Sequence, residues 1–261
     1  MKLTLKSLTL FLLCTFFTCA QAESFRLSYE TISASEIEKN PKYQSLKQID
    51  PGHHQTIIRI YSLPEGENYT LKWERPLFIK KDHHHECSKE VFTRLKEFLS
   101  DENLLFVTSS RGFVPGETVT WSLETADGTH KTEKISFIPN PIIQEIPLGG
   151  AKLRVELVGL RPTYYEIYLD GVPNETLTLK SRSSGEIIDQ DFYYTKGSCM
   201  AISPDVIGKS GGFCDLALIR STGGQFKLRL PWGEEALEHI FGEQDPITPE
   251  FTPISENNAA K

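Results

Sequence analysis

Apolar and polar residues alternate in short stretches along much of this chain. Residues 69–74 and 118–123 show the alternation, and residues 56–61 and 104–109 are rich in β-branched and other apolar residues. Such stretches are typical of strands in a sheet with at least one buried face. Asp127-Gly128 then supplies a hairpin turn, because both residues tolerate positive φ angles. Residues 55–138 are therefore predicted to form a β-sandwich module.

One segment of this module follows a helical period instead. Four apolar residues recur at the spacing that places them on one helix face, and Ser88 precedes them as a candidate N-cap. They are Val91, Leu95, Phe98 and Leu99. Residues 88–99 are therefore predicted to form an amphipathic helix inserted between two strands.

The strand rhythm restarts after a Pro-Asn-Pro boundary at residues 139–141. Seven short strand candidates lie between residues 152 and 230, and turns such as Asp170-Gly171 separate them. This frequency of strands is typical of a β-sandwich. Residues 142–232 are predicted to form a second module. We expect alternation to bury Tyr165, and to turn Tyr164 and Tyr168 toward solvent as candidate binding residues.

A short motif resembles a known family. Gly-Phe-Val-Pro-Gly-Glu-Thr-Val-Thr-Trp at residues 112–121, followed by Ala-Asp-Gly at 126–128, resembles the second strand and hairpin of immunoglobulin-like domains in exported bacterial proteins. Trp121 lacks the two flanking cysteines of antibody domains, and a fold by itself does not specify a function. The predicted fold class is therefore all-β, with two immunoglobulin-like β-sandwich modules and one inserted amphipathic helix.

The ends of the chain carry a different composition. Residues 1–22 combine two lysines, an apolar run and a final Ala-Gln-Ala, which predicts a cleaved signal peptide. An uncleaved anchor and a lipid-modified Cys19 are the alternatives. Residues 23–54 are predicted to be an irregular lead-in, and the polar, proline-containing residues 242–261 a disordered tail.

The net charge of the chain limits the classes of molecule that it is expected to bind. The chain has 28 basic and 35 acidic residues; without the two lysines of residues 1–22, the counts are 26 and 35, a net charge of −9. A nucleic-acid role is therefore not expected, because phosphate contacts would lack counter-charges. No later stretch is apolar and long enough to predict a transmembrane span. We expect an exported protein, in the periplasm, at the cell surface or extracellular, whose partner is another envelope or extracellular protein.

Three cysteines remain after residue 22. Cys199 and Cys214 lie in neighbouring predicted strands, and an oxidising compartment would let them form a disulfide. Cys87 is left as a buried free thiol, or as a ligand together with His83 and His85. An extended segment would place these three side chains on one side, and imidazole with thiolate suits zinc or copper. The favoured interpretation is a solvated polar loop with no cofactor.

The sequence contains no complete catalytic set. Neither a Gly-x-Ser-x-Gly elbow nor a full phosphate-binding loop occurs, since Ser203 stands where the loop at residues 208–212 would need its first glycine. The predicted function is therefore a non-catalytic structural or protein-binding module of the cell envelope. The alternatives are a metal-binding protein that uses residues 82–87 and a hydrolase whose site is dispersed over loops.

Overall fold

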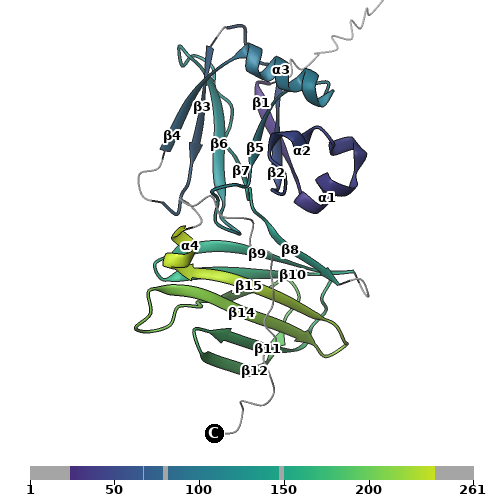
Figure 1. Ribbon diagram of the computed structural model, residues 1–261, viewed down its shortest axis with the longest axis vertical. Helices are drawn as coiled ribbons and strands as arrows, with labels where there is room; N and C mark the ends of the chain where they lie inside the picture. Colours follow the sequence, from purple (N-terminus) through teal and green to yellow (C-terminus); the bar gives the residue numbers. More distant parts are fainter. Residues whose placement is uncertain (1–23, 67, 79–81, 147–149, 239–261) are drawn as a thin grey trace, which may run out of the picture.

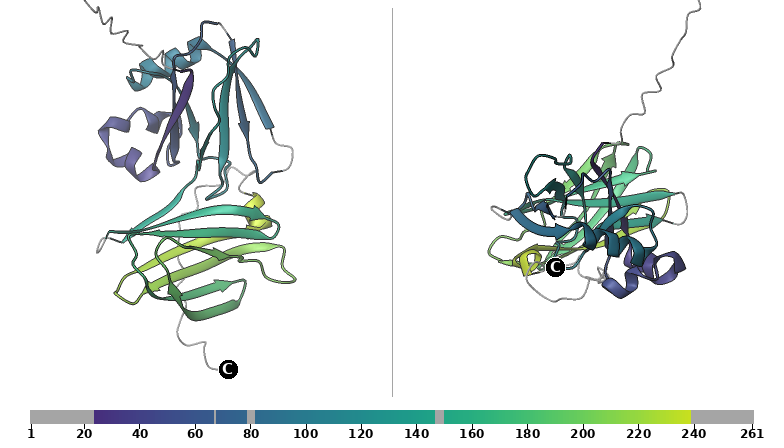
Figure 2. Two further views of the ribbon diagram at one scale, coloured as in Figure 1. Left: turned by 180° about the vertical axis from the view of Figure 1, so that it is seen from behind. Right: turned by 90° about the horizontal axis from the view of Figure 1, so that it is seen from above.

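A computed structural model of the chain describes residues 24–66, 68–78, 82–146 and 150–238. These residues form two β-sandwich modules that lie end to end along the long axis of the molecule (Figures 1 and 2). The predicted signal peptide, Cys19 and the predicted disordered tail lie outside the described residues. No helix within the described residues is both long and apolar enough to cross a membrane.

The first module packs a three-stranded sheet against a four-stranded sheet. The first sheet has the order β1-β2-β5, with β1 at Arg26–Ile32, β2 at Gln55–Tyr61 and β5 at Leu104–Ser109. The second sheet has the order β4-β3-β6-β7, with β3 at Asn68–Glu74, β4 at Asp82–Ser88, β6 at Val119–Thr125 and β7 at Ile135–Phe137. Seven antiparallel strands whose connections cross between two sheets form an immunoglobulin-like sandwich.

Helices cover the outer face of the first sheet. Helix α1 spans Ala34–Lys39, the 3-10 helix η1 spans Pro41–Tyr43, and α2 spans Leu46–Ile49. Their buried residues join β2 and β5 in a separate apolar cluster. The expectation of an irregular lead-in was wrong, because β1 pairs with β2 along seven residues and these helices bury the sheet behind it.

Helix α3, at Lys89–Leu99, connects β4 to β5 across one end of the first module (Figure 1). The helix is present as predicted, but its buried face differs. Phe92 is fully buried between the sheets, whereas Val91 and Phe98 are exposed. Leu95 and Leu99 do pack inward, against β5. The spacing alone could not separate the two overlapping apolar faces, and docking on the sheet selected the one that contains Phe92.

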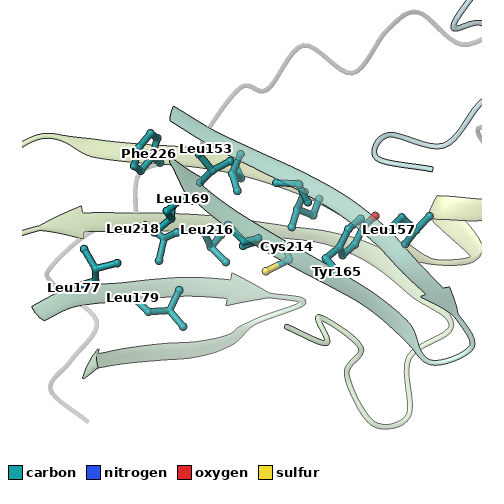
Figure 3. Packing of buried hydrophobic residues seen from close by; sticks show 14 of the residues in the cluster. Leu153, Leu157, Tyr165, Leu169, Leu177, Leu179, Cys214, Leu216, Leu218 and Phe226 are labelled. Atoms are coloured by element: carbon teal, nitrogen blue, oxygen red, sulfur yellow. The ribbon is translucent and has the colours of Figure 1, made fainter. Parts of the chain in front are cut away.

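The second module packs two four-stranded sheets around a single apolar core (Figure 3). One sheet has the order β13-β10-β9-β8, with β8 at Ile142–Ile146, β9 at Ala151–Leu160, β10 at Thr163–Asp170 and β13 at Cys199–Ile202. The other has the order β12-β11-β14-β15, with β11 at Glu175–Ser183, β12 at Glu186–Tyr194, β14 at Gly211–Arg220 and β15 at Gln225–Gly233. A short helix, α4, follows at Glu234–Glu238. The all-β prediction of two sandwiches with an inserted helix is confirmed.

The Pro-Gly-Glu turn of the first module forms the junction with the second. Gly116 has a φ of +82°, and a Cβ there would lie 3.1 Å from the backbone nitrogen of Leu157. The amide of Leu157 donates to the carbonyl oxygen of Gly116 at 2.9 Å. Only glycine combines this backbone angle with so close an approach. Val114, the first residue of the same turn, is buried in the core of the second module.

A buried ion pair reinforces this junction. Arg75 donates through Nε to Oε1 of Glu117 at 2.6 Å and through Nη2 to the second carboxylate oxygen. The side chains of Arg75 and Glu117 are 5% and 0% exposed. Glu117 also accepts from the backbone amide of Val114 at 3.1 Å. Because both charges are bonded several times, the pair fixes the turn that carries the junction.

Candidate functional site

The first module contains a cleft of about 870 Å³ between its two sheets. It opens on the side where β4 and β5 each form the edge of a sheet. Its lining comes from α2, β3, β4, β5, β6 and the loop after β5: Ile49, Asp50, Leu71, Trp73, His84, His85, Phe106, Val107, Thr108, Ser109, Arg111, Phe113 and Trp121. Seven of these residues are apolar and six are polar, and the volume lies in the range of about 300–1,000 Å³ that is typical of ligand sites.

Aromatic rings form the inner wall of the cleft. The ring centroids of Trp73 and Trp121 lie 6.3 Å apart, and Phe113 contacts Trp73 edge-on at 5.8 Å. Phe106 of β5 lies 5.4 Å from Trp121 across the two sheets. Rings at these separations support one another and hold the wall in one shape. The inner wall of the cleft is therefore a preformed apolar surface.

Trp121 adds a hydrogen-bond donor without an acceptor to this wall. Its indole N–H is buried and has no acceptor among the described residues. A buried donor without an acceptor costs about 1–3 kcal/mol. A ligand carbonyl that reached the indole would recover part of that free energy.

A polar cluster forms one rim. Asp50, just after α2, accepts from Nη2 of Arg111 at 2.7 Å, lies 3.3 Å from Nδ1 of His53, and accepts from the hydroxyl of Ser109. Burial acts to raise the pKa of Asp50, but the bonds from Arg111 and Ser109 and the charge of His53 outweigh it and lower the pKa. Ser109 donates to the carboxylate and not to an imidazole, so the cluster lacks the serine–histidine link of a nucleophilic triad.

The histidine-rich segment is strand β4, not a loop. Its register on β3 places His83, His85 and Cys87 opposite Trp73, Leu71 and Tyr69. His85 is exposed at the cleft, whereas Cys87 is 6% exposed and donates to the carbonyl oxygen of Tyr69 at 3.6 Å. Burial raises the pKa of the Cys87 thiol to about 11.

A metal site would need these groups to converge. The described residues contain no group of three or more His, Cys, Asp or Glu side chains that could hold a metal ion. The side chain of His83 lies outside the described residues. Zinc or copper binding at His83, His85 and Cys87 stays a prediction from the sequence.

The expected disulfide between Cys199 and Cys214 does not form in this structure. Both thiols are free, with Cys199 exposed and Cys214 buried. Cys199 lies on β13, which pairs with β10, whereas Cys214 lies on β14 in the opposite sheet and points into the core (Figure 3). The two strands follow one another in sequence but not in the sheet, which is why the sequence suggested a contact.

The reactivity of the thiols provides a test. Among the three cysteines that the structure describes, we expect only Cys199 to react rapidly with a disulfide reagent such as DTNB in the native protein. Cys87 and Cys214 should react only after unfolding, because burial raises their pKa values to about 11 and about 12 and the thiolate is the nucleophile. Mass spectrometry of the labelled protein would identify the residue. Fast labelling of Cys214 in the native protein would contradict this arrangement.

The tyrosines of β10 alternate as predicted. Tyr165 is fully buried and Tyr164 is 39% exposed. Tyr168 is half-buried, because the guanidinium of Arg154 covers its ring at 4.2 Å and its hydroxyl donates to Glu166. These tyrosines lie in the second module, away from the cleft, and their role in binding stays a prediction.

Comparisons with known proteins give structural likeness only. No family model and no curated protein sequence matches this chain. A segment of two fibronectin type-III domains from chicken tenascin matches with 12% identity and a TM-score of 0.23, over 69% of this chain and 94% of that one. The FN1–FN3 domains of chicken CNTN1 match with 8% identity and a TM-score of 0.23, over 69% and 60%. A tetra-tandem repeat of a large adhesion protein matches with 8% identity and a TM-score of 0.24, over 80% and 49%.

Sequence patterns did not reveal the cleft. Alternation in β3 does place Trp73 on the same face as Leu71, and alternation in β6 places Trp121 on its inner face. The missing information was that the edge strands β4 and β5 line the same cleft from different sheets and leave the space between the sheets open. The available signal was one tryptophan at an inward position of each of the strands predicted at residues 69–74 and 118–123.

Proposed function

We propose that this chain is an exported, non-catalytic protein-binding module that holds an extended segment of another envelope or extracellular protein in the cleft. The observation that carries the proposal is the aromatic wall between the two open sheet edges. An extended segment can pair its backbone with an edge strand while alternate side chains enter a pocket. The rings of Trp73, Phe106 and Trp121 suit large apolar side chains.

The polar rim supports the same class of ligand. The carboxylate of Asp50 is already bonded to Arg111, Ser109 and His53, so it offers little to a polar ligand such as a sugar. The remaining hydrogen-bonding partners along the opening are the side chains of His84, His85 and Thr108 and the backbone groups at the outer edges of β4 and β5. A peptide strand, which carries a row of backbone N–H and C=O groups, can bond to these groups better than a compact polar molecule can.

Selection from a displayed library of ten-residue peptides tests the proposal. We expect the mature protein to enrich sequences with aromatic or large aliphatic residues at alternate positions. A selected peptide should bind Trp73→Ala about 30-fold more weakly or worse, because a buried aromatic anchor contributes about 2 kcal/mol or more. Binding can be followed by the fluorescence of Trp73 and Trp121 in a Trp232→Phe background, since the chain has three tryptophans.

Two further variants separate binding from folding. Thr108→Arg should fill the cleft from the β5 edge and block the peptide while leaving the aromatic wall intact. Phe98→Ala removes an exposed ring of α3 outside the cleft and should bind as the unchanged protein does. If all three variants bind alike, or if no alternating motif is enriched, the cleft is not a peptide site.

Export is supported by the composition of residues 1–22. N-terminal sequencing of the protein recovered from outside the cytoplasm should then begin at Glu23. A chain that begins at Met1 would point to an uncleaved anchor, and one that begins at a modified Cys19 would point to a lipoprotein.

A further inference from the structure

Strand β12 forms an unprotected edge of the second module. All six residues from Glu186 to Asp191 are exposed, although they alternate between the two faces of the sheet. The strand pairs with β11 over nine residues without a shift in register, and its sequence contains neither proline nor lysine. Natural edge strands are usually blocked by proline, a bulge, a covering segment or charged side chains. Of these features, β12 carries only charged side chains, the acids Glu186, Asp189 and Asp191, which disfavour acidic partners but not basic ones. β12 therefore presents a long, regular edge.

The opposite edge of the same sheet is protected. The side chain of Gln144, from β8, accepts from the backbone amide of Lys227 on β15 at 3.0 Å and donates to the carbonyl oxygen of the same residue. Pro231 removes one further backbone donor from β15. Only β12 keeps an open edge in the described part of this sheet, which indicates that the two edges serve different purposes.

Charge alternates from strand to strand on the outer face of this sheet. β12 contributes acids, β11 bases, β14 an acid and β15 bases: Asp189 and Asp191, then Lys180 and Arg182, then Asp215, then Lys227 and Arg229. Lys180 lies 3.4 Å from Asp189, and Arg229 lies 3.6 Å from Asp215. Oppositely charged neighbours across strands are favourable. A strand added beyond β12 would continue the series with basic residues.

The inner face of β12 borders a cavity of about 260 Å³, between β12 and the segment that follows β13. Glu186, Ile188 and Gln190 of β12 line it, together with Leu179 and Val206. Ile188 is 49% exposed there. An added strand would place its inward side chains beside this cavity, where apolar residues would cover Ile188.

A second copy of β12 is a poor partner, because each copy brings three acids, Glu186, Asp189 and Asp191, to the shared edge. We propose that β12 is a strand-addition site for an extended segment of a partner protein, with lysine or arginine at alternate positions and apolar residues between them. The site is independent of the cleft in the first module. It gives the second module a recognition surface of its own.

A nine-residue peptide that alternates lysine and valine, blocked at both ends, is the probe. In NMR titrations of the mature protein we expect shifts at the amides of β12 and slower exchange at alternate β12 amides, which point away from β11. The same peptide with N-methyl groups on its edge-facing amides keeps its charge but cannot pair, and should lose most of its affinity.

Charge variants provide the second arm. Asp189→Lys with Asp191→Lys should weaken binding by about tenfold or more, because like charges then face each other, and should favour a glutamate–valine peptide. Glu102→Lys with Glu133→Lys is the control: both residues are exposed in the first module, and the net charge changes equally. Trp73→Ala should leave this binding unchanged, so a failure here is distinct from a failure of the cleft.

Equal binding of the N-methylated peptide, or an equal loss in both charge variants, would reduce the effect to general attraction between charges and overturn the proposal. Circular dichroism confirms that each variant is folded. Shifts confined to the first module would also overturn it.

Discussion

Replacing Arg75 with methionine is expected to lower the free energy of unfolding by about 3–5 kcal/mol, which urea denaturation of the mature protein would measure. Methionine keeps much of the apolar stem but removes the guanidinium, whose central carbon lies 4.4 Å and 5.0 Å from the ring centroids of Phe78 and Phe113. The carboxylate of Glu117 is then left fully buried with the amide of Val114 as its remaining partner among the bonds described above. An uncompensated buried charge is costly, and it lies at the junction of the modules.

Two controls identify the cause. Arg75→Met combined with Glu117→Leu removes both charges and should recover much of the lost stability, because a buried pair can be replaced by apolar residues at little cost. Arg94→Met breaks the exposed pair with Glu90 and should change stability by less than about 1 kcal/mol. Equal effects of Arg75→Met and Arg94→Met would mean that the junction pair contributes no more than a surface pair.

Replacing Phe92 with alanine is expected to destabilise the first module by about 3–5 kcal/mol. Phe92 is the fully buried anchor of α3, and its ring lies 5.9 Å from that of Tyr69. Its removal leaves a cavity in close-packed surroundings and loses the apolar area that holds the helix against the sheets. Thermal and urea unfolding would both report the change.

Phe98→Ala is the matched control, because it removes the same ring six residues later on α3, where Phe98 is 43% exposed. We expect a change within about 0.5 kcal/mol. The helical period in the sequence assigned Phe98 to the buried face. If Phe98→Ala were the more damaging change, the orientation of α3 in this structure would be wrong.

Strands were the most predictable elements, because alternation is a local property. Tyr165 and Tyr164 are neighbours, yet the pleat sends one into the core and the other toward solvent, as the sequence indicated. The inserted helix was equally visible from its period. Its orientation was not, because two overlapping apolar faces satisfied the same spacing and only contact with a sheet distinguishes them.

Pairing between distant strands could not be predicted from local patterns in the sequence. Residues 26–32 alternate like any edge strand, but their membership in the first sheet depends on β2, which lies beyond three intervening helical segments. Cys199 and Cys214 were expected to meet because their strands are consecutive. The chain instead crosses to the opposite sheet between β13 and β14, which leaves one thiol outside and the other in the core.

The sequence alone determined the all-β class, the positions of most strands, the inserted helix and the lack of a complete catalytic motif, since each depends on residues that are close in the chain. Tertiary structure decided the junction pair, the cleft and the open edge at β12. Arg75 and Glu117 are 42 positions apart, and the cleft draws on six segments. These features depend on how the sheets pack and on which surfaces the packing leaves uncovered. A local pattern in the sequence encodes neither.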